Sequence, residues 1–275
     1  MSTVITSAPV LYKMAPLAQR AMTCALAAWG GVLIAGQLLF ALYVALFYGG
    51  ALLRGTPTDW NKVLPNGWTA GDPAGNLALA AHVLFAVVIM LCGIVQLLPA
   101  VRRRAPRLHR ISGRIYLSLA VLASLAGLYM VATRGVIGGT AQHIGVSIAG
   151  LLIVLFAAQA LRYVRRGDIG AHRRYAMRLF MVVSAVWFYR VGLMFWIAVN
   201  RGPAGFDPKT FTGPFLDFLA FAQFLLPLAV LELYFRVQNS SAGARLGFAA
   251  LLLLLTAAMA VGVAMAMMGM WLPRL

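Results

Sequence analysis

The chain has 275 residues, of which 62% are hydrophobic and 11% charged, and its mean hydropathy is +0.87. This composition excludes a soluble globular domain, and a membrane domain of this size leaves no length for a separate soluble catalytic module. The formal charge of +17 does not indicate nucleic-acid binding. The arginines cluster in short loops between apolar runs, which is typical of loops retained in the cytoplasm.

Seven apolar runs are long enough to cross a bilayer. They predict an all-α integral membrane protein with a single polytopic domain over residues 1–275. The second to fifth spans, within about 76–200, are expected to form a central four-helix bundle, and the other three are expected to be peripheral. The predicted spans are about 21–53, 76–101, 108–135, 142–164, 173–200, 214–236 and 246–272.

Two loops carry most of the basic residues, and they predict the orientation in a bacterial inner membrane. Cytoplasmic loops carry the excess of Lys and Arg, so both loops should face the cytoplasm. Alternation then places the N-terminus in the cytoplasm and the C-terminus on the periplasmic side. The arginines are Arg102, Arg103, Arg104, Arg107, Arg110 and Arg114 in the first group, and Arg162, Arg165, Arg166, Arg173, Arg174 and Arg178 in the second.

The chain has four histidines, one near the start of each of the second to fifth predicted spans. Because antiparallel helices alternate in direction, His82 and His143 should share the outer side, and His109 and His172 the inner side. Paired neutral imidazoles on facing helices are the ligands that a b-type haem requires. The pattern therefore predicts one or two haem b groups, with these four histidines as ligands of haem iron.

Arginines near the histidines are candidates for binding haem propionates. Arg190 lies eighteen residues after His172, which is five helical turns, and Arg134 lies on nearly the same face as His109. An unpaired arginine within a span costs about 2.5–3.5 kcal/mol, so Arg190 needs a partner, either Asp217 or a propionate. The predicted propionate ligands are Arg134 and Arg190 outside and Arg110, Arg114, Arg173 and Arg178 inside.

Glu232 and Arg236 are four residues apart in the sixth predicted span. This spacing brings two side chains together on one helix face, so we expect them to form an ion pair with no functional role.

Two long segments resemble a known family. The segments AHVLFAVVIMLCGIVQLLPAVRRRAPRLHRISGRIY (81–116) and YVRRGDIGAHRRYAMRLF (163–180), with YR at 189–190, resemble the bacterial predicted-membrane-protein family named domain of unknown function 2306. The resemblance covers about 110 residues. It implies a shared membrane fold and no agreed activity.

The layout of the four histidines is also similar to that of the cytochrome b-561 family. In that family, spans two to five supply two bis-histidine haems that move electrons from ascorbate across the membrane. The resemblance implies a transmembrane oxidoreductase, with membrane lipids and small redox donors and acceptors as partners. It implies no oligomeric state.

Two other functions fit the same residues. A transporter or lipid-binding scaffold without haem would use the His and Arg clusters to bind anionic groups. A membrane enzyme acting on a lipid has little support, because the chain has only six acidic residues and only Asp168 is close to a cytoplasmic histidine.

Overall fold

The structure is a computed structural model that describes residues 8–64 and 67–275, with side chains from residue 15 onward. The described residues form helices joined by loops, which confirms the predicted all-α class. The elements are α1 (Ala8–Val44), η1 (Ala45–Gly49), α2 (Gly50–Leu53), η2 (Pro57–Lys62), α3 (Pro73–Leu97), α4 (Pro99–Arg104), α5 (Pro106–Arg134), α6 (Thr140–Arg165), α7 (Ile169–Val183), α8 (Ala185–Asn200), α9 (Pro214–Val237), α10 (Ala242–Ala266), η3 (Met267–Trp271) and η4 (Leu272–Arg274).

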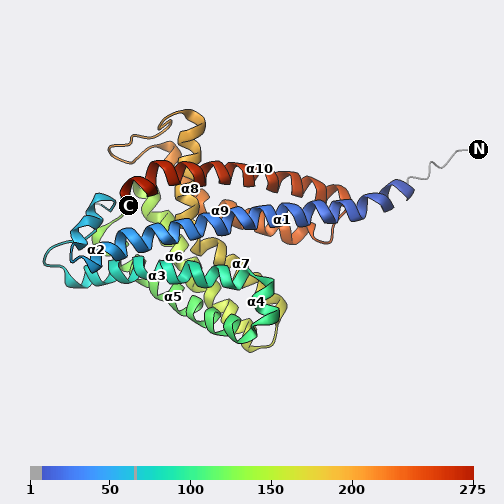
Figure 1. The fold of residues 1–275 in the computed structure, drawn as a ribbon, viewed down its shortest axis with the longest axis horizontal. Coiled ribbons are helices and arrows are strands. Elements are labelled where there is room, and N and C mark those ends of the chain that lie inside the picture. The colour runs from blue at the N-terminus through green and yellow to red at the C-terminus, as the bar shows by residue number, and fades with distance from the viewer. Residues whose placement is uncertain (1–7, 65–66) are drawn as a thin grey trace, which may run out of the picture.

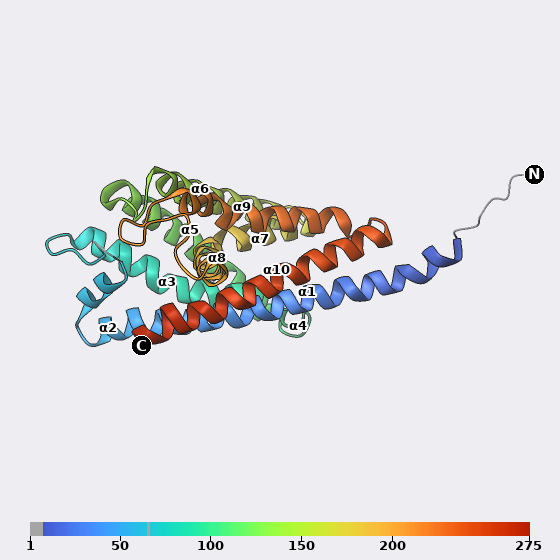
Figure 2. The ribbon, with the colours of Figure 1, turned by 90° about the horizontal axis from the view of Figure 1, so that it is seen from above.

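Within the described residues, six helices are long and apolar enough to cross a membrane. The fifth predicted span is broken into α7 and α8, which meet at an angle of 51°. Counting this pair as one span gives the seven that the sequence predicts. Figures 1 and 2 show α8 standing at a steep angle to the long axis that α1 and α10 follow.

The break between α7 and α8 lies at Ser184, whose ψ of 0° departs from helical geometry. The side-chain amide of Gln37, on α1, donates a hydrogen bond of 2.8 Å to the Ser184 hydroxyl, and both side chains are buried. An apolar environment makes an unpaired amide costly. The Gln37–Ser184 bond therefore fixes α1 against the break.

The helices pack in pairs along the molecule. α3 packs against α5, α6 against both α5 and α7, and α9 covers α6 and α7. α1 and α10 lie side by side across one face, and α1 also contacts α3 (Figures 1 and 2). The 54–72 loop and the C-terminus lie at one end, here called the loop end. α4 and the α6–α7 turn lie at the other, here called the arginine-rich end.

Aromatic side chains close the core at the loop end. Trp60 and Trp271 are both fully buried, and the Trp60 indole N–H donates to the Tyr48 carbonyl oxygen at 3.0 Å. Trp271 packs on Phe40 and Tyr43 of α1, with ring centroids 5.2 and 6.4 Å away. These contacts join the end of α10 to α1 and to the loop that follows it.

Candidate functional site

His82 lies on α3 with its ring buried against α5. Its Nδ1 is 2.7 Å from the carbonyl oxygen of Ala123. Gly127, one turn further along α5, leaves room for the ring, since an added Cβ there would lie 3.2 Å from the His82 Cε1. When Nδ1–H donates to a carbonyl, the lone pair of a neutral imidazole is on Nε2. Metal-binding histidines commonly make the same hydrogen bond through the ring nitrogen that does not bind the metal.

His143 closes the loop between α5 and α6. Its Nε2 accepts a hydrogen bond of 3.0 Å from the main-chain N–H of Val136. Its ring also lies beside Gly135, where an added Cβ would be 3.3 Å from the ring. The Nε2 lone pair is thus already used in holding the loop.

The contacts of His82 and His143 place their rings at different depths, and the predicted outer pair stays a prediction without support from them. The His82 ring lies against Gly127 and the His143 ring against Gly135, eight residues further along the chain. Eight residues at 1.5 Å each separate the rings by about 12 Å in depth. Two imidazoles on one metal must each reach it at about 2 Å. The residues present at the loop end therefore do not fit an outer bis-histidine haem.

His172 and His109 do approach each other at the arginine-rich end. The His172 Nδ1 is 2.9 Å from the carbonyl oxygen of Ala160 on α6, which repeats the arrangement of His82. His109 lies in the first turn of α5 and His172 in the first turn of α7, at the same end of the bundle. The His109 Nδ1 is buried with no hydrogen-bond partner among the described residues. An unpartnered ring nitrogen beside a second, oriented imidazole fits a site for a shared ligand.

The main chain around His109 is tied to α3. The Gln96 side-chain amide donates to the His109 carbonyl oxygen at 2.9 Å and to the Ser112 hydroxyl at 2.7 Å. Gly113, on the next turn, leaves room for the Gln96 side chain. The first turn of α5 is therefore fixed against α3, although His109 lies near a helix end.

Arg134 is committed to a protein partner. It forms a two-pronged ion pair with Asp72, at 3.0 Å from Nε and 2.7 Å from Nη2, and also donates to Asn76 and to the Gly67 carbonyl. The Asp72 carboxylate also caps α3 by accepting from the Gly75 N–H at 2.9 Å. The Gly75 N–H and the Arg134 guanidinium hold the pKa of Asp72 below its usual range. Arg134 therefore has a protein partner in place of the expected propionate, and its role toward a haem stays an untested prediction.

Arg178 is also paired, and its partner corrects a second expectation. Its Nε and Nη2 bind the two oxygens of Glu232 on α9, at 2.6 and 3.0 Å. The predicted Glu232–Arg236 pair does not form, because Glu232 is turned toward α7 instead. Arg178 is consequently not free for a propionate, and it links α7 to α9.

Three predicted inner arginines remain free. Arg110, Arg114 and Arg173 are exposed at the arginine-rich end and form no ion pair with any described residue. They are near the chain positions of His109 and His172, and arginine binds carboxylates and phosphates well. These three side chains are available for an anionic group.

Arg190 does not pair with Asp217. Its guanidinium lies 5.2 Å from the Phe40 ring centre and donates to the Val186 carbonyl at 3.2 Å. The break at Ser184 ends the continuous helix on which Arg190 was expected to share a face with His172. Arg190 instead lies close enough to His82 for its charge to act on the His82 ring.

Sequence reasoning missed Asp72 as the partner of Arg134. A signal was present for Asp72, because Asp followed by Pro73 is the signature of an N-cap with proline in the first helical turn. No local signal marks the partners of Gln96, which lie on another helix.

A family model described as "Predicted membrane protein (DUF2306)" matches residues 79–226, which include all four histidines. Neither a search of curated proteins nor a search of solved structures finds a significant match. The layout resemblance to the cytochrome b-561 family therefore stays a prediction.

Proposed function

The chain belongs to the DUF2306 family of predicted membrane proteins, and we propose that it is an electron-transfer protein holding one b-type haem between His109 and His172. The observation that supports this is the unpartnered, buried Nδ1 of His109 beside the oriented ring of His172. Two neutral imidazoles from different helices are the ligand set of a b-type haem. The haem would supply one-electron exchange between a donor and an acceptor.

Each residue of this site has a proposed role in holding the haem. The Ala160 carbonyl holds the His172 ring through Nδ1, which leaves Nε2 free to bind iron. Gln96 fixes the turn that carries His109. Arg110, Arg114 and Arg173 would bind the propionates as exposed cations without protein partners.

We also propose that the arginine-rich end faces the cytoplasm of a bacterial inner membrane, with the N-terminus inside and the C-terminus outside. A reporter enzyme that is active only outside the cytoplasm should be active when fused after residue 70 and inactive when fused after residue 105. The reverse pattern would overturn this orientation.

The haem proposal is tested by spectroscopy on the full chain, purified in detergent after expression with ample haem. The reduced-minus-oxidised spectrum should show a b-type band at about one haem per chain. His109→Ala and His172→Ala should each remove the band. His143→Ala is the matched control and should keep it, because that ring only closes a loop.

Three results would reject the proposal: no band in the wild-type protein, a band that survives both inner substitutions, or a band lost in His143→Ala. The last result would restore the outer pair in place of the inner one.

The second candidate is a scaffold without haem that binds phosphate-bearing groups at the arginine-rich end. The free guanidinium groups of Arg110, Arg114 and Arg173 favour it. It predicts a flat difference spectrum together with salt-sensitive binding to anionic vesicles, lost when the three arginines are replaced by glutamine.

A further inference from the structure

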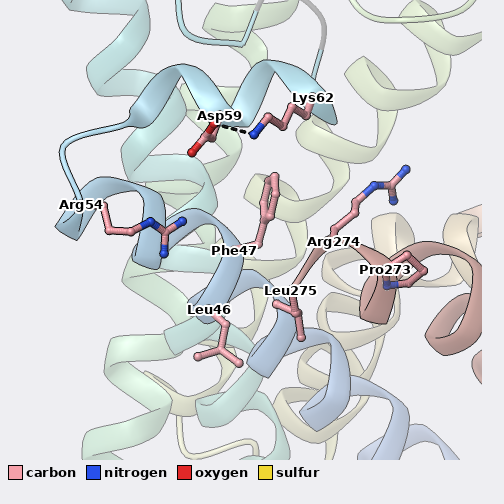
Figure 3. A pocket seen from close by; sticks show the side chains of 8 residues that line it. All are labelled: Leu46, Phe47, Arg54, Asp59, Lys62, Pro273, Arg274 and Leu275. Atoms are coloured by element: carbon pink, nitrogen blue, oxygen red, sulfur yellow. Dashed lines mark ion pairs between the residues drawn. The ribbon is translucent and has the colours of Figure 1, made fainter.

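A cavity of about 480 Å³ lies at the loop end, far from the inner histidines. It is formed where the end of α1 continues into η1 and α2, and where η2 and η4 fold over it (Figure 3). The lining residues are Leu46, Phe47, Arg54, Asp59, Lys62, Pro273, Arg274 and Leu275. The cavity therefore brings together segments more than 200 residues apart in the chain.

The lining side chains of the cavity are unbalanced in charge. Three side chains are cationic and one, Asp59, is acidic, and Leu275 adds a main-chain carboxylate to the lining. The Asp59 carboxylate is already occupied, since it binds the Lys62 ammonium at 2.7 Å and accepts from the Thr56 hydroxyl at 2.9 Å. Arg54 and Arg274 have no acidic partner among the described residues. The Arg274 guanidinium donates one hydrogen bond of 2.7 Å to the Met270 carbonyl oxygen, and its other N–H groups, with those of Arg54, remain to attract an anion.

The wall of the cavity below these cations is apolar and leads onto the outside of α1. Figure 3 shows Leu46 and Leu275 on the opposite side of the cavity from Lys62 and Asp59. Leu38, Leu42 and Leu46 are 44%, 54% and 51% exposed and are spaced four residues apart, so they form one exposed stripe. The stripe runs for about 12 Å along the helix. The cavity is therefore basic on one side and continues into an apolar track.

Behind the cavity lies a second group of polar atoms without partners. The hydroxyl of Tyr43 and the indole N–H of Trp271 are buried with no hydrogen-bond partner among the described residues. Tyr43 lies close enough to Arg274 and Arg190 for both charges to act on its hydroxyl group. The Tyr43 hydroxyl and the Trp271 indole are neutral, so they add unsatisfied polar atoms to the neighbouring core and no charge.

We propose that this cavity binds the phosphate of an anionic phospholipid, with its headgroup between Arg54 and Arg274 and an acyl chain along the Leu38–Leu42–Leu46 stripe. Guanidinium groups recognise phosphate through charge-assisted hydrogen bonds. The apolar stripe selects a phosphate attached to a lipid over free phosphate. This site is independent of the haem proposal, because it shares no residue with it.

The test measures lipid binding to the purified full chain in detergent by native mass spectrometry. The probes are dioleoyl-phosphatidylglycerol and dioleoyl-phosphatidylcholine. The anionic lipid should bind the tightest site at least tenfold more strongly. In the double variant Arg54→Gln/Arg274→Gln, its affinity should fall at least tenfold, because both free guanidinium groups are removed.

The matched control is Arg201→Gln/Lys209→Gln, which removes two positive charges from the exposed 201–213 loop. It should change the affinity by less than twofold. Equal losses in the two double variants would overturn the proposal in favour of diffuse surface charge. Unchanged melting temperatures check that all variants fold.

A competition arm distinguishes the source of the phosphate. Inorganic phosphate at 100-fold excess over the lipid should leave phosphatidylglycerol bound, because it gains nothing from the leucine stripe. Displacement of the lipid by inorganic phosphate would overturn the lipid proposal and assign the cavity to a free anion.

Discussion

The closest helix contact around α8 makes a sharp prediction about Gly262 of α10. A Cβ added to Gly262 would lie 2.7 Å from the Val191 Cγ1, which is 0.7 Å inside the 3.4 Å at which ordinary contact begins, and would also clash with the Val191 carbonyl. Overpacking of this kind costs about 1–3 kcal/mol. Alanine is a better helix former than glycine by about 1 kcal/mol. Gly262→Ala should therefore destabilise the protein by up to about 2 kcal/mol.

Gly247 provides the control on the same helix. An added Cβ there meets nothing within 4 Å, so Gly247→Ala should keep the gain in helix propensity and stabilise by up to about 1 kcal/mol. The two variants should differ by roughly 2 kcal/mol, or about 4–8 °C in melting temperature, measured by thermal unfolding in one detergent. If Gly262→Ala melts as high as Gly247→Ala, α8 does not pack on α10 as described, and the steep course of α8 is wrong.

Two ion pairs give further predictions. The pKa of Asp72 is lowered in the folded protein. Its pair with Arg134 therefore stabilises the fold fully above the ordinary carboxyl pKa of about 4. This stabilisation is lost as the pH falls through the lowered pKa of the folded state. The melting-temperature advantage of wild type over Asp72→Asn should accordingly shrink between pH 7 and pH 3, and a constant advantage would contradict the role of the charge. Arg178→Gln should cost about 1–2 kcal/mol by leaving Glu232 unpaired, near the low end because Glu232 is 38% exposed. The double variant Arg178→Gln/Glu232→Gln should recover most of this loss in the same unfolding assay, and no recovery would argue against their coupling.

Hydrophobic run lengths were sufficient to predict the all-α class and the number of spans. They were insufficient for the fifth span, because a break at Ser184 depends on Gln37, a residue of another helix. An apolar run reports that a segment is buried in lipid or protein and contains no information about such a tertiary hydrogen bond. The same limit explains why Glu232 was paired with Arg236 on its own helix, when the actual partner is Arg178 on α7.

The histidine pattern showed which imidazoles share an end of the bundle, but not their depth. The His82 and His143 rings contact positions that are about 12 Å apart along α5 and the residue that follows it. This difference arises because packing sets how far neighbouring helices are shifted along their axes. Gly127 and Gly135 determine where each ring fits. Helical periodicity shows on which face of a helix a residue lies. It does not show how far one helix is shifted along its axis relative to its neighbour. His109 and His172 lie at the same end of the bundle because both lie in the first turn of their helices at the same basic boundary, and their pairing stays a prediction.

The bond between Gln37 and Ser184 joins a residue outside the family-matched range to one inside it. The recognisable segment, 79–226, is consequently not a free-standing module. Excising it would strip α1 and α10 from the joint between α7 and α8, leaving the Ser184 hydroxyl without its amide donor and Val191 facing lipid where Gly262 now lies.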